Sequence, residues 1–169
     1  MRDATEAHRA KGRHLAAIHR GYLHDLGMIA RVLEQIQQGL TAPDQLQEFI
    51  LSSSISQNFH AFGTLCGEGC KILQLHHAME EGHMFSELEA KGNAALTAIV
   101  TRLREEHKVI HALLDRLEDA AGILIADPSE TNFAATGAAF KHLDRVIRSH
   151  FRYEETELEE PIGVYLDGI

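Results

Sequence analysis

The sequence FKHLDRVIRSHFRYEETE, residues 140–157, decides the fold of this chain. Apolar residues recur at Phe140, Leu143 and Ile147, which is the spacing of one face of an α-helix. His150 and Glu154 continue the same line four residues apart, so both side chains leave the helix on the face that should be buried. Burying an unpaired polar or charged group costs several kcal/mol. The imidazole and the carboxylate on this face therefore need partners.

Three more long helices are predicted upstream, because the chain has only three prolines and long stretches rich in Leu, Ala, Glu, Gln and Arg. The predicted helices cover residues 5–38, 44–51, 59–90, 94–125 and 131–157. The residues that mark the ends of the long helices are Gly39 and Pro43, Gly92 and Asn93, the turn Asp127, Pro128, Ser129, and Pro161. Long amphipathic helices with short connections predict an all-α fold, an antiparallel up-down-up-down four-helix bundle. No repeat divides residues 1–169, so we expect a single domain.

The composition excludes several classes of partner. The 169 residues include 16 Lys and Arg against 25 Asp and Glu, a net charge of -9, so we expect binding neither to nucleic acid nor to an anionic membrane. The sequence shows no secretory signal and no run of about 18 apolar residues, which leads us to expect a cytoplasmic protein. Two cysteines cannot form a disulfide framework. Histidine is the unusual residue, because its 12 copies outnumber Phe and Tyr together.

The second long helix carries the run HHAMEE at residues 76–81. This run offers two overlapping pairs with a spacing of four, His76 with Glu80 and His77 with Glu81. Both pairs lie on plausible apolar stripes, so periodicity alone leaves open which of them faces the core.

The other helices also place imidazoles on their inner stripes. His19 interrupts the stripe of the first helix, and His107 and His111 lie four residues apart on the third. A single inward histidine is more often a hydrogen-bonded core residue than a ligand. Five imidazoles and two or three carboxylates, however, cannot be buried together without repulsion or unpaired lone pairs unless cations lie among them. Imidazole suits Zn, Cu, Fe and Ni, and carboxylates suit harder ions, so the mixed set argues against a thiolate-type structural zinc site. Seven ligands exceed the needs of one ion, which favours two ions that share bridging carboxylates, and carboxylate-bridged di-iron sites are built in helical bundles in this way.

At this point the chain resembles the hemerythrin-like family, also called the HHE cation-binding domain, over essentially its whole length. The motifs that carry the resemblance are His76 and Glu80 followed by Met84-Phe85, Glu106-His107 with His111, the closing run His150-Phe151-Arg152-Tyr153-Glu154-Glu155, and Ile18-His19 with Asp25-Leu26. Two positions depart from the family pattern. The oxygen carriers place an Asp five residues after the fourth-helix His, where this chain has Glu154 at four, and Ser86 stands where a Pro is common.

The resemblance implies a non-haem di-iron centre with a bridging oxo or hydroxo group. The implied ligands are His107, His111 and His150 for one iron, His19 and His76 for the other, and Glu80 and Glu154 as bridges. The resemblance thus favours His76 over His77. The iron with two imidazoles would keep an open position for dioxygen or peroxide.

The sequence leaves more than one function open. The first hypothesis is a protein that binds, carries or senses dioxygen or iron, since a histidine-rich ligand set leaves few positions for a substrate. The alternative is a di-iron oxidase, a peroxide-consuming enzyme or an oxygenase that acts on a small molecule. A third is a structural bundle that holds zinc or no metal. His77 and His83 could orient a ligand, and Cys66 and Cys70 are either small packing residues or a redox pair.

Overall fold

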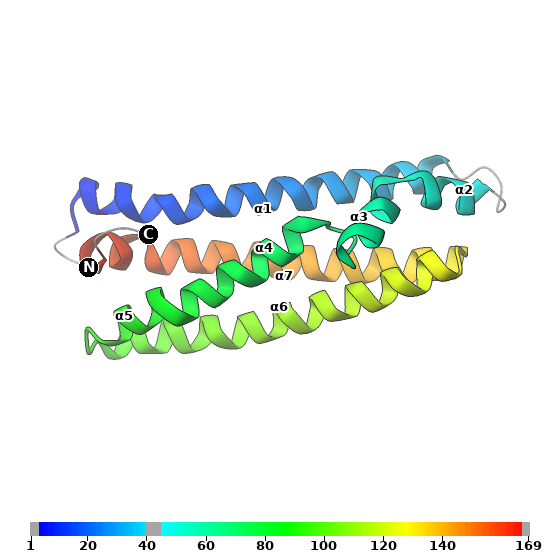
Figure 1. Ribbon diagram of the computed structural model, residues 1–169. Helices are drawn as coiled ribbons and strands as arrows, with labels where there is room; N and C mark the ends of the chain where they lie inside the picture. The colour runs from blue at the N-terminus through cyan, green and yellow to red at the C-terminus, as the bar shows by residue number, and fades with distance from the viewer. Residues whose placement is uncertain (1–3, 40–44, 167–169) are drawn as a thin grey trace.

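The structure, a computed structural model, describes residues 4–39 and 45–166, and every regular element in these ranges is a helix (Figure 1). The helices are α1 (Glu6–Gly39), α2 (Gln45–Ser52), α3 (Ser54–Phe62), α4 (Glu68–Met79), the π-helix η1 (Glu80–Met84), α5 (Phe85–Glu89), α6 (Ala94–Ala126) and α7 (Glu130–Tyr165). The all-α prediction is therefore confirmed for these residues. The break predicted at Pro43 and the helix start at Asp44 lie outside them. None of the described helices is long and apolar enough to span a membrane.

The long helices lie side by side along the long axis of the molecule, and α2 and α3 lie at the opposite end from α5 (Figure 1). Helix α7 packs against both α1 and α6. Near one end, α1 and α7 approach so closely that a Cβ atom on Gly12 would overlap the backbone of Glu159. A Cβ atom on Gly163 would likewise overlap the backbone of His8. Only glycine fits at these two positions, so this helix pair is fixed at short range.

The prediction of one continuous helix over residues 59–90 is wrong. Gly63 and Gly67 both have positive φ angles, 75° and 62°, and they end α3 and precede α4 respectively. The Asn58 side chain closes the intervening turn by donating to the Leu65 carbonyl oxygen at 2.8 Å. The left-handed conformation of the two glycines breaks the helix here, because it does not fit a right-handed helix.

The fourth long helix is longer than predicted. It continues to Tyr165 with Pro161 inside it, whereas the sequence predicts an end near Glu157. An internal proline removes one hydrogen bond and crowds the carbonyl four residues earlier, at a cost of about 3 kcal/mol. Leu158 and Ile162 are fully buried on either side of Pro161, and burying such a side chain contributes about 1.5–3 kcal/mol. Tertiary packing therefore outweighs the local cost of the proline.

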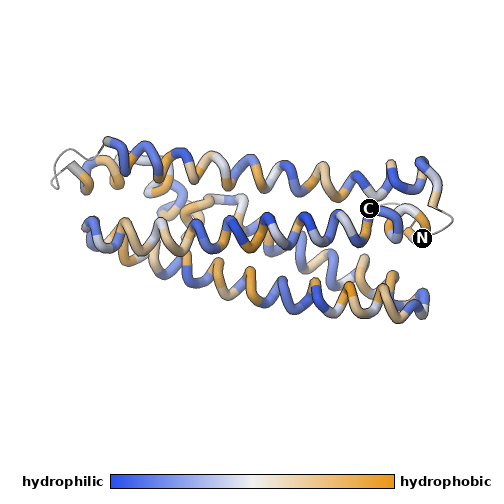
Figure 2. The backbone as a smooth tube through the Cα atoms, turned by 180° about the vertical axis from the view of Figure 1, so that it is seen from behind, coloured by the Kyte–Doolittle hydropathy of each residue, from blue (hydrophilic) through white to orange (hydrophobic). Residues whose placement is uncertain are grey.

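A layer of polar side chains divides the apolar core into two clusters. One cluster includes Leu26, Ile110 and Ile147, and the other includes Leu15 and Leu158. Hydrophobic and hydrophilic residues alternate along each helix (Figure 2), as expected for helices with one buried face. Between the clusters lie buried titratable side chains, His19 on α1, His77 on α4, Glu80 on η1, His107 on α6, and His150 and Glu154 on α7.

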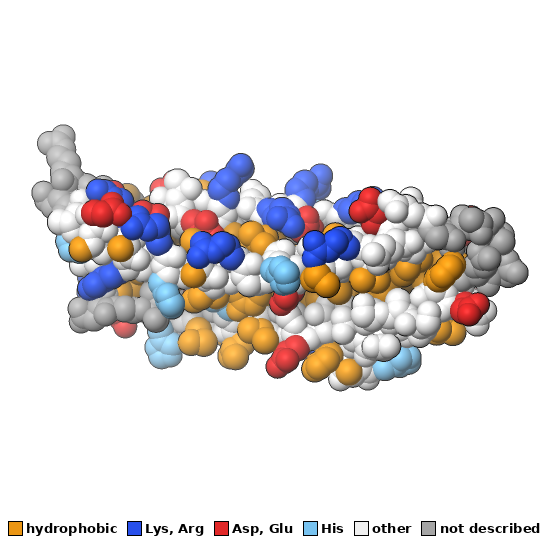
Figure 3. Space-filling model, turned by 90° about the horizontal axis from the view of Figure 1, so that it is seen from above, with side chains coloured by type: hydrophobic (Ala, Val, Ile, Leu, Met, Phe, Trp, Pro, Cys, Tyr) orange, Lys and Arg blue, Asp and Glu red, His pale blue; other side chains and the backbone are white. Residues whose placement is uncertain are grey.

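The surface carries charged and hydrophobic side chains together (Figure 3). Exposed hydrophobic side chains are ordinary on a protein surface. Buried imidazoles and carboxylates are not, because a polar group inside a protein needs a partner. The polar layer is therefore the informative feature of this fold.

Candidate metal centre

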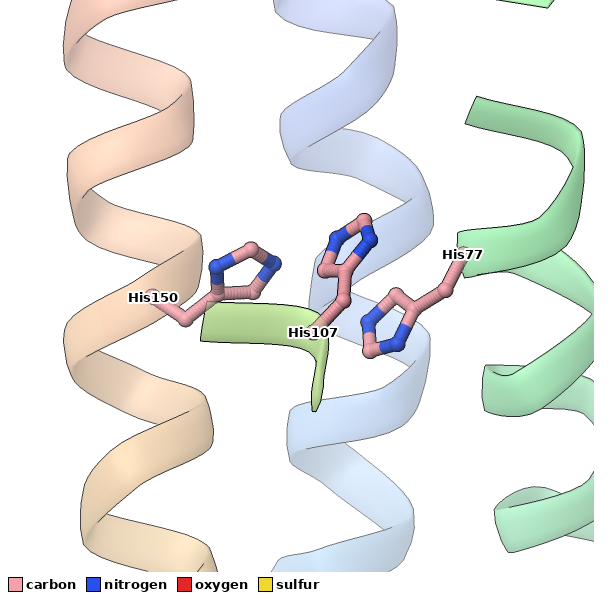
Figure 4. A group of neighbouring side chains, drawn as sticks. All are labelled: His77, His107 and His150. Carbon is pink, nitrogen blue, oxygen red and sulfur yellow. The ribbon is translucent and has the colours of Figure 1, made fainter. Parts of the chain in front are cut away.

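Seven side chains bring their ligand atoms together in two groups inside the polar layer. The first group consists of His77, His107 and His150, and the second of His19, His76, Glu80 and Glu154. Within each group the ligand atoms all lie within 4.8 Å of one another. Figure 4 shows the first group, in which imidazoles from α4, α6 and α7 converge. Each group offers at least three nitrogen or oxygen donors to one ion.

The two carboxylates lie between the groups. Glu80 places Oε1 2.9 Å from His76 Nε2 in its own group and Oε2 3.4 Å from His107 Nε2 in the other. Glu154 takes a similar position from α7, with Oε2 3.5 Å and 3.7 Å from one imidazole of each group. Because each carboxylate faces both groups, each could bridge two ions.

The outer nitrogens of the buried imidazoles are held by hydrogen bonds. Three of them contact a glutamate: His19 Nδ1 with Glu155 Oε1 at 2.9 Å, His107 Nδ1 with Glu81 Oε1 at 2.9 Å, and His150 Nδ1 with Glu106 Oε2 at 3.0 Å. An ionised carboxylate only accepts hydrogen bonds, so Nδ1 carries the proton in each pair. Nε2 then carries the lone pair and lies on the inner side of each ring, which is the arrangement that orients histidine ligands in metal sites.

The residues fit a metal, because most of their inward atoms have no hydrogen-bond partner; the exceptions are Nε2 of His19 and Nε2 of His76, which lie 3.2 Å apart. Among the described residues, seven buried side-chain atoms lack a hydrogen bond: Nε2 of His77, His107 and His150, and both carboxylate oxygens of Glu80 and Glu154. All of them belong to the two groups. An unpaired buried polar atom costs about 1–3 kcal/mol, so seven in one place would be strongly destabilising without an ion among them.

The protonation states of the centre also suit cations. Burial, together with the neighbouring imidazoles, lowers the pKa of His19 to about 3, that of His77 to about 2 and that of His150 to about 4. Burial opposes ionisation of Glu80, but its neighbouring imidazoles outweigh burial and lower its pKa. Burial and the nearby Glu80 raise the pKa of Glu154. These three imidazoles are therefore neutral at pH 7, which is the form that binds a metal.

Six of the seven residues predicted from the sequence lie in the two groups. The exception is His111, which belongs to neither, and His77 takes its place beside His107 and His150. His111 lies behind His77, with Nε2 3.0 Å from His77 Nδ1. A signal for His77 was present in the sequence, because His77 lies on the second apolar stripe of its helix together with Leu73.

A cavity of about 310 Å³ borders the second group only. His76 and Glu80 line it, together with apolar side chains and the exposed His83 and Glu87. The His76 side chain is 10% exposed, whereas the other members of the two groups are buried. The centre therefore borders this cavity on the His76 side.

The cysteines supply no ligand atom to the two groups, and Tyr22 contacts the second group only by packing its ring against that of His76, with ring centroids 5.4 Å apart. Cys66 and Cys70 are free thiols, and a hydrogen bond with Cys70 together with burial raises the pKa of Cys66 well above its usual value. Such thiols are less reactive than exposed ones. The Tyr22 hydroxyl contacts the Ile72 carbonyl oxygen at 3.4 Å, so it donates to the backbone.

Comparison with known proteins identifies a family. Residues 8–160 match the sequence model described as the Hemerythrin HHE cation binding domain. This range contains all seven residues of the two groups. Searches of curated proteins and of solved structures gave no match.

Proposed function

We propose that this chain, which belongs to the Hemerythrin HHE cation binding domain family, holds two non-haem iron ions and binds or senses dioxygen or iron with them. Metal binding follows from the family and from the two His/Glu groups. The choice of iron is supported by the mixed imidazole and carboxylate donors, which lack the thiolates typical of structural zinc sites. The long helices would act as the antiparallel four-helix bundle on which such centres are built.

In this proposal the two groups divide the ligands. One ion would be held by His77, His107 and His150, the other by His19 and His76, and Glu80 and Glu154 would bridge them. The observation that carries the proposal is the set of seven unpaired buried atoms that face the centre. When bound, two irons with an oxo or hydroxo bridge supply redox chemistry and an open coordination position for dioxygen or peroxide.

The rest of the chain prepares these ligands. Glu155, Glu81 and Glu106 keep the proton on the outer nitrogen of their imidazoles, so the inner nitrogens stay free. The two apolar clusters exclude water on either side of the layer. The cavity provides an approach beside His76 and Glu80. The ligand set with two imidazoles, where the open position would lie, thus borders this cavity.

Two functions fit this arrangement. Five imidazoles and two carboxylates nearly saturate two ions, which favours binding, carrying or sensing over chemistry on a substrate. The size of the cavity favours the second candidate, an oxidase, a peroxide-consuming enzyme or an oxygenase. Reversible oxygenation would support the first, and turnover of peroxide or of an organic substrate would support the second.

The first test is the metal content and optical spectrum of aerobically purified protein. We expect about two irons per chain and near-ultraviolet absorption from an oxo-bridged ferric pair. The matched control is a protein in which both bridging carboxylates are replaced, Glu80→Gln with Glu154→Gln, which should hold less than one iron. Zinc, or no metal even after anaerobic loading with ferrous iron, would overturn the proposal.

A further inference from the structure

The cavity beside His76 is far larger than dioxygen or peroxide requires. Its volume is about 310 Å³, whereas one water molecule occupies about 30 Å³ in the liquid. A cavity of about 150 Å³ in another protein binds benzene, so this cavity has room for a molecule about twice the volume of benzene. It falls at the lower end of the range for pockets that bind small organic molecules, about 300–1,000 Å³. An access route for a diatomic gas alone does not need this space.

The lining of the cavity is mainly apolar and comes from segments far apart in the sequence. Its apolar side chains are Leu15 and Ile18 on α1, Met79 on α4, Met84 on η1, and Leu166 directly after α7. Two of the apolar side chains are methionines, which adapt their shape to different ligands. Such a wall stabilises a bound molecule by removing apolar surface from water.

The polar groups of the cavity lie at its two ends. His76 and Glu80 belong to the metal centre, whereas His83 and Glu87 are exposed and therefore mark the solvent side. Neither lysine nor arginine is among the described residues that line the cavity. A ligand with a carboxylate would place its charge beside Glu80, beside Glu87 or in the apolar wall, and none of these positions offers it a lysine or arginine partner. An ammonium group would lose its hydration in the apolar wall, and beside the exposed Glu87 it would form only a surface ion pair, which contributes little.

We propose that this cavity is a binding site for a small, uncharged organic molecule with an apolar body of about two fused rings. A single hydroxyl on such a molecule finds a partner in His83 or Glu87 at the solvent side. The bound molecule lies against His76 and Glu80, directly beside the second ligand group. This proposal goes beyond the function proposed above, because the side chains that hold the ligand are those of the protein and not the metal.

The test uses 2-naphthylmethanol as the uncharged probe and 2-naphthoate as its anionic counterpart. Isothermal titration calorimetry of the purified full-length protein should show one binding site for the alcohol and at least tenfold weaker binding of the carboxylate. The chain has no Trp, so naphthalene fluorescence provides a second reading of the same binding. On iron-loaded protein the proton NMR signals of the bound alcohol should broaden, because the paramagnetic centre lies next to the cavity.

Two variants locate the site. Met79→Trp fills the cavity from a side chain that is 59% exposed, so it should weaken the alcohol at least tenfold without unfolding the protein. Leu75→Trp is the matched control, since Leu75 lies one turn earlier on the same helix, is 60% exposed and does not line the cavity. The helix content of both variants is checked by circular dichroism.

Three results would overturn this proposal. They are absence of binding of the alcohol to folded protein, equal weakening by both tryptophan variants, and tighter binding of the carboxylate than of the alcohol. The iron content of the same samples is measured separately. Low iron with intact binding of the alcohol contradicts only the function proposed above, and normal iron without binding contradicts only this proposal.

Discussion

Substitution of two histidines decides which of them ligates the first ion. The geometry assigns His77 to the first group and places His111 behind it, whereas the family resemblance implies His111. We therefore expect His77→Ala to lose about one of two ions per chain, and His111→Ala to retain both. The reason is that, of these two histidines, His77 directs an unpaired buried nitrogen at the centre and His111 does not.

The expected magnitudes follow from the position of each ring. His77 is fully buried, and its removal takes one of three imidazoles from the first ion and leaves a buried cavity in its place, so we expect this ion to be lost during gel filtration. Loss of His111 instead frees His77 Nδ1, which now lies 3.0 Å from His111 Nε2. Removing an outer partner of a histidine ligand weakens metal affinity about 10–100-fold without changing the number of ions. His142→Ala, an exposed position on α7, is the control and should change neither quantity.

The assay combines elemental analysis after gel filtration with competition against a chelator. Elemental analysis gives the number of ions, and the competition gives the affinity of each variant relative to the unmodified protein. The assignment fails if His111→Ala loses one ion while His77→Ala keeps two. In that case His111 would have to displace His77 when the metal binds.

Three further predictions concern other parts of the structure. Gly12→Ala should lower the free energy of unfolding by about 1–3 kcal/mol in urea titrations, because its Cβ overlaps the Glu159 backbone; an unchanged midpoint would show that α1 and α7 separate freely. Glu106→Gln should weaken iron about 10–100-fold in chelator competition at unchanged stoichiometry, since it removes the carboxylate that holds His150 Nδ1; full affinity would contradict this role. The metal-free protein should lose stability as the pH falls below about 6.5. The pKa values of His19 and His150 are about 3 and 4 in the folded protein against 6.5 ordinarily, so the unfolded state binds more protons below pH 6.5. Each of the two imidazoles therefore lowers the free energy of unfolding by up to about 1.4 kcal/mol per pH unit, down to about pH 4. Urea midpoints that do not change between pH 7 and 5 would contradict this prediction.

Local sequence signals placed most helix ends correctly. Helix α6 begins after Asn93, whose side chain accepts from Ala95 N–H at 2.9 Å, and α7 begins after Ser129, which caps it in the same way. Local sequence signals did not predict the break between α3 and α4. A glycine inside a helix costs only about 1 kcal/mol, so Gly63 and Gly67 are compatible with either a helix or a turn. The contact of Asn58 with the turn, which the sequence does not reveal, favours the turn.

The extension of α7 past Pro161 has the same origin. A proline near the end of a helical pattern is a reasonable stop signal, and its cost is local. The compensation is not local, because Ile162 and Leu166 pack in the cluster that contains Leu15 of α1. Sequence periodicity reports which residues of one helix share a face, but it does not report what that face meets.

The ambiguity between His76 and His77 had a physical reason. The periodicity analysis assumes that a helix buries one face, so that only one of two neighbouring residues lies on it. Adjacent residues leave a helix about 100° apart, so one helix that lies between two ligand groups can serve both. Here His76 joins the group that contains His19, and His77 stacks on His107 with ring centroids 3.9 Å apart. A tandem histidine on an inner face therefore fits the two ion positions proposed above, and Glu80, the first residue of the π-helix that follows, faces both groups from the same segment.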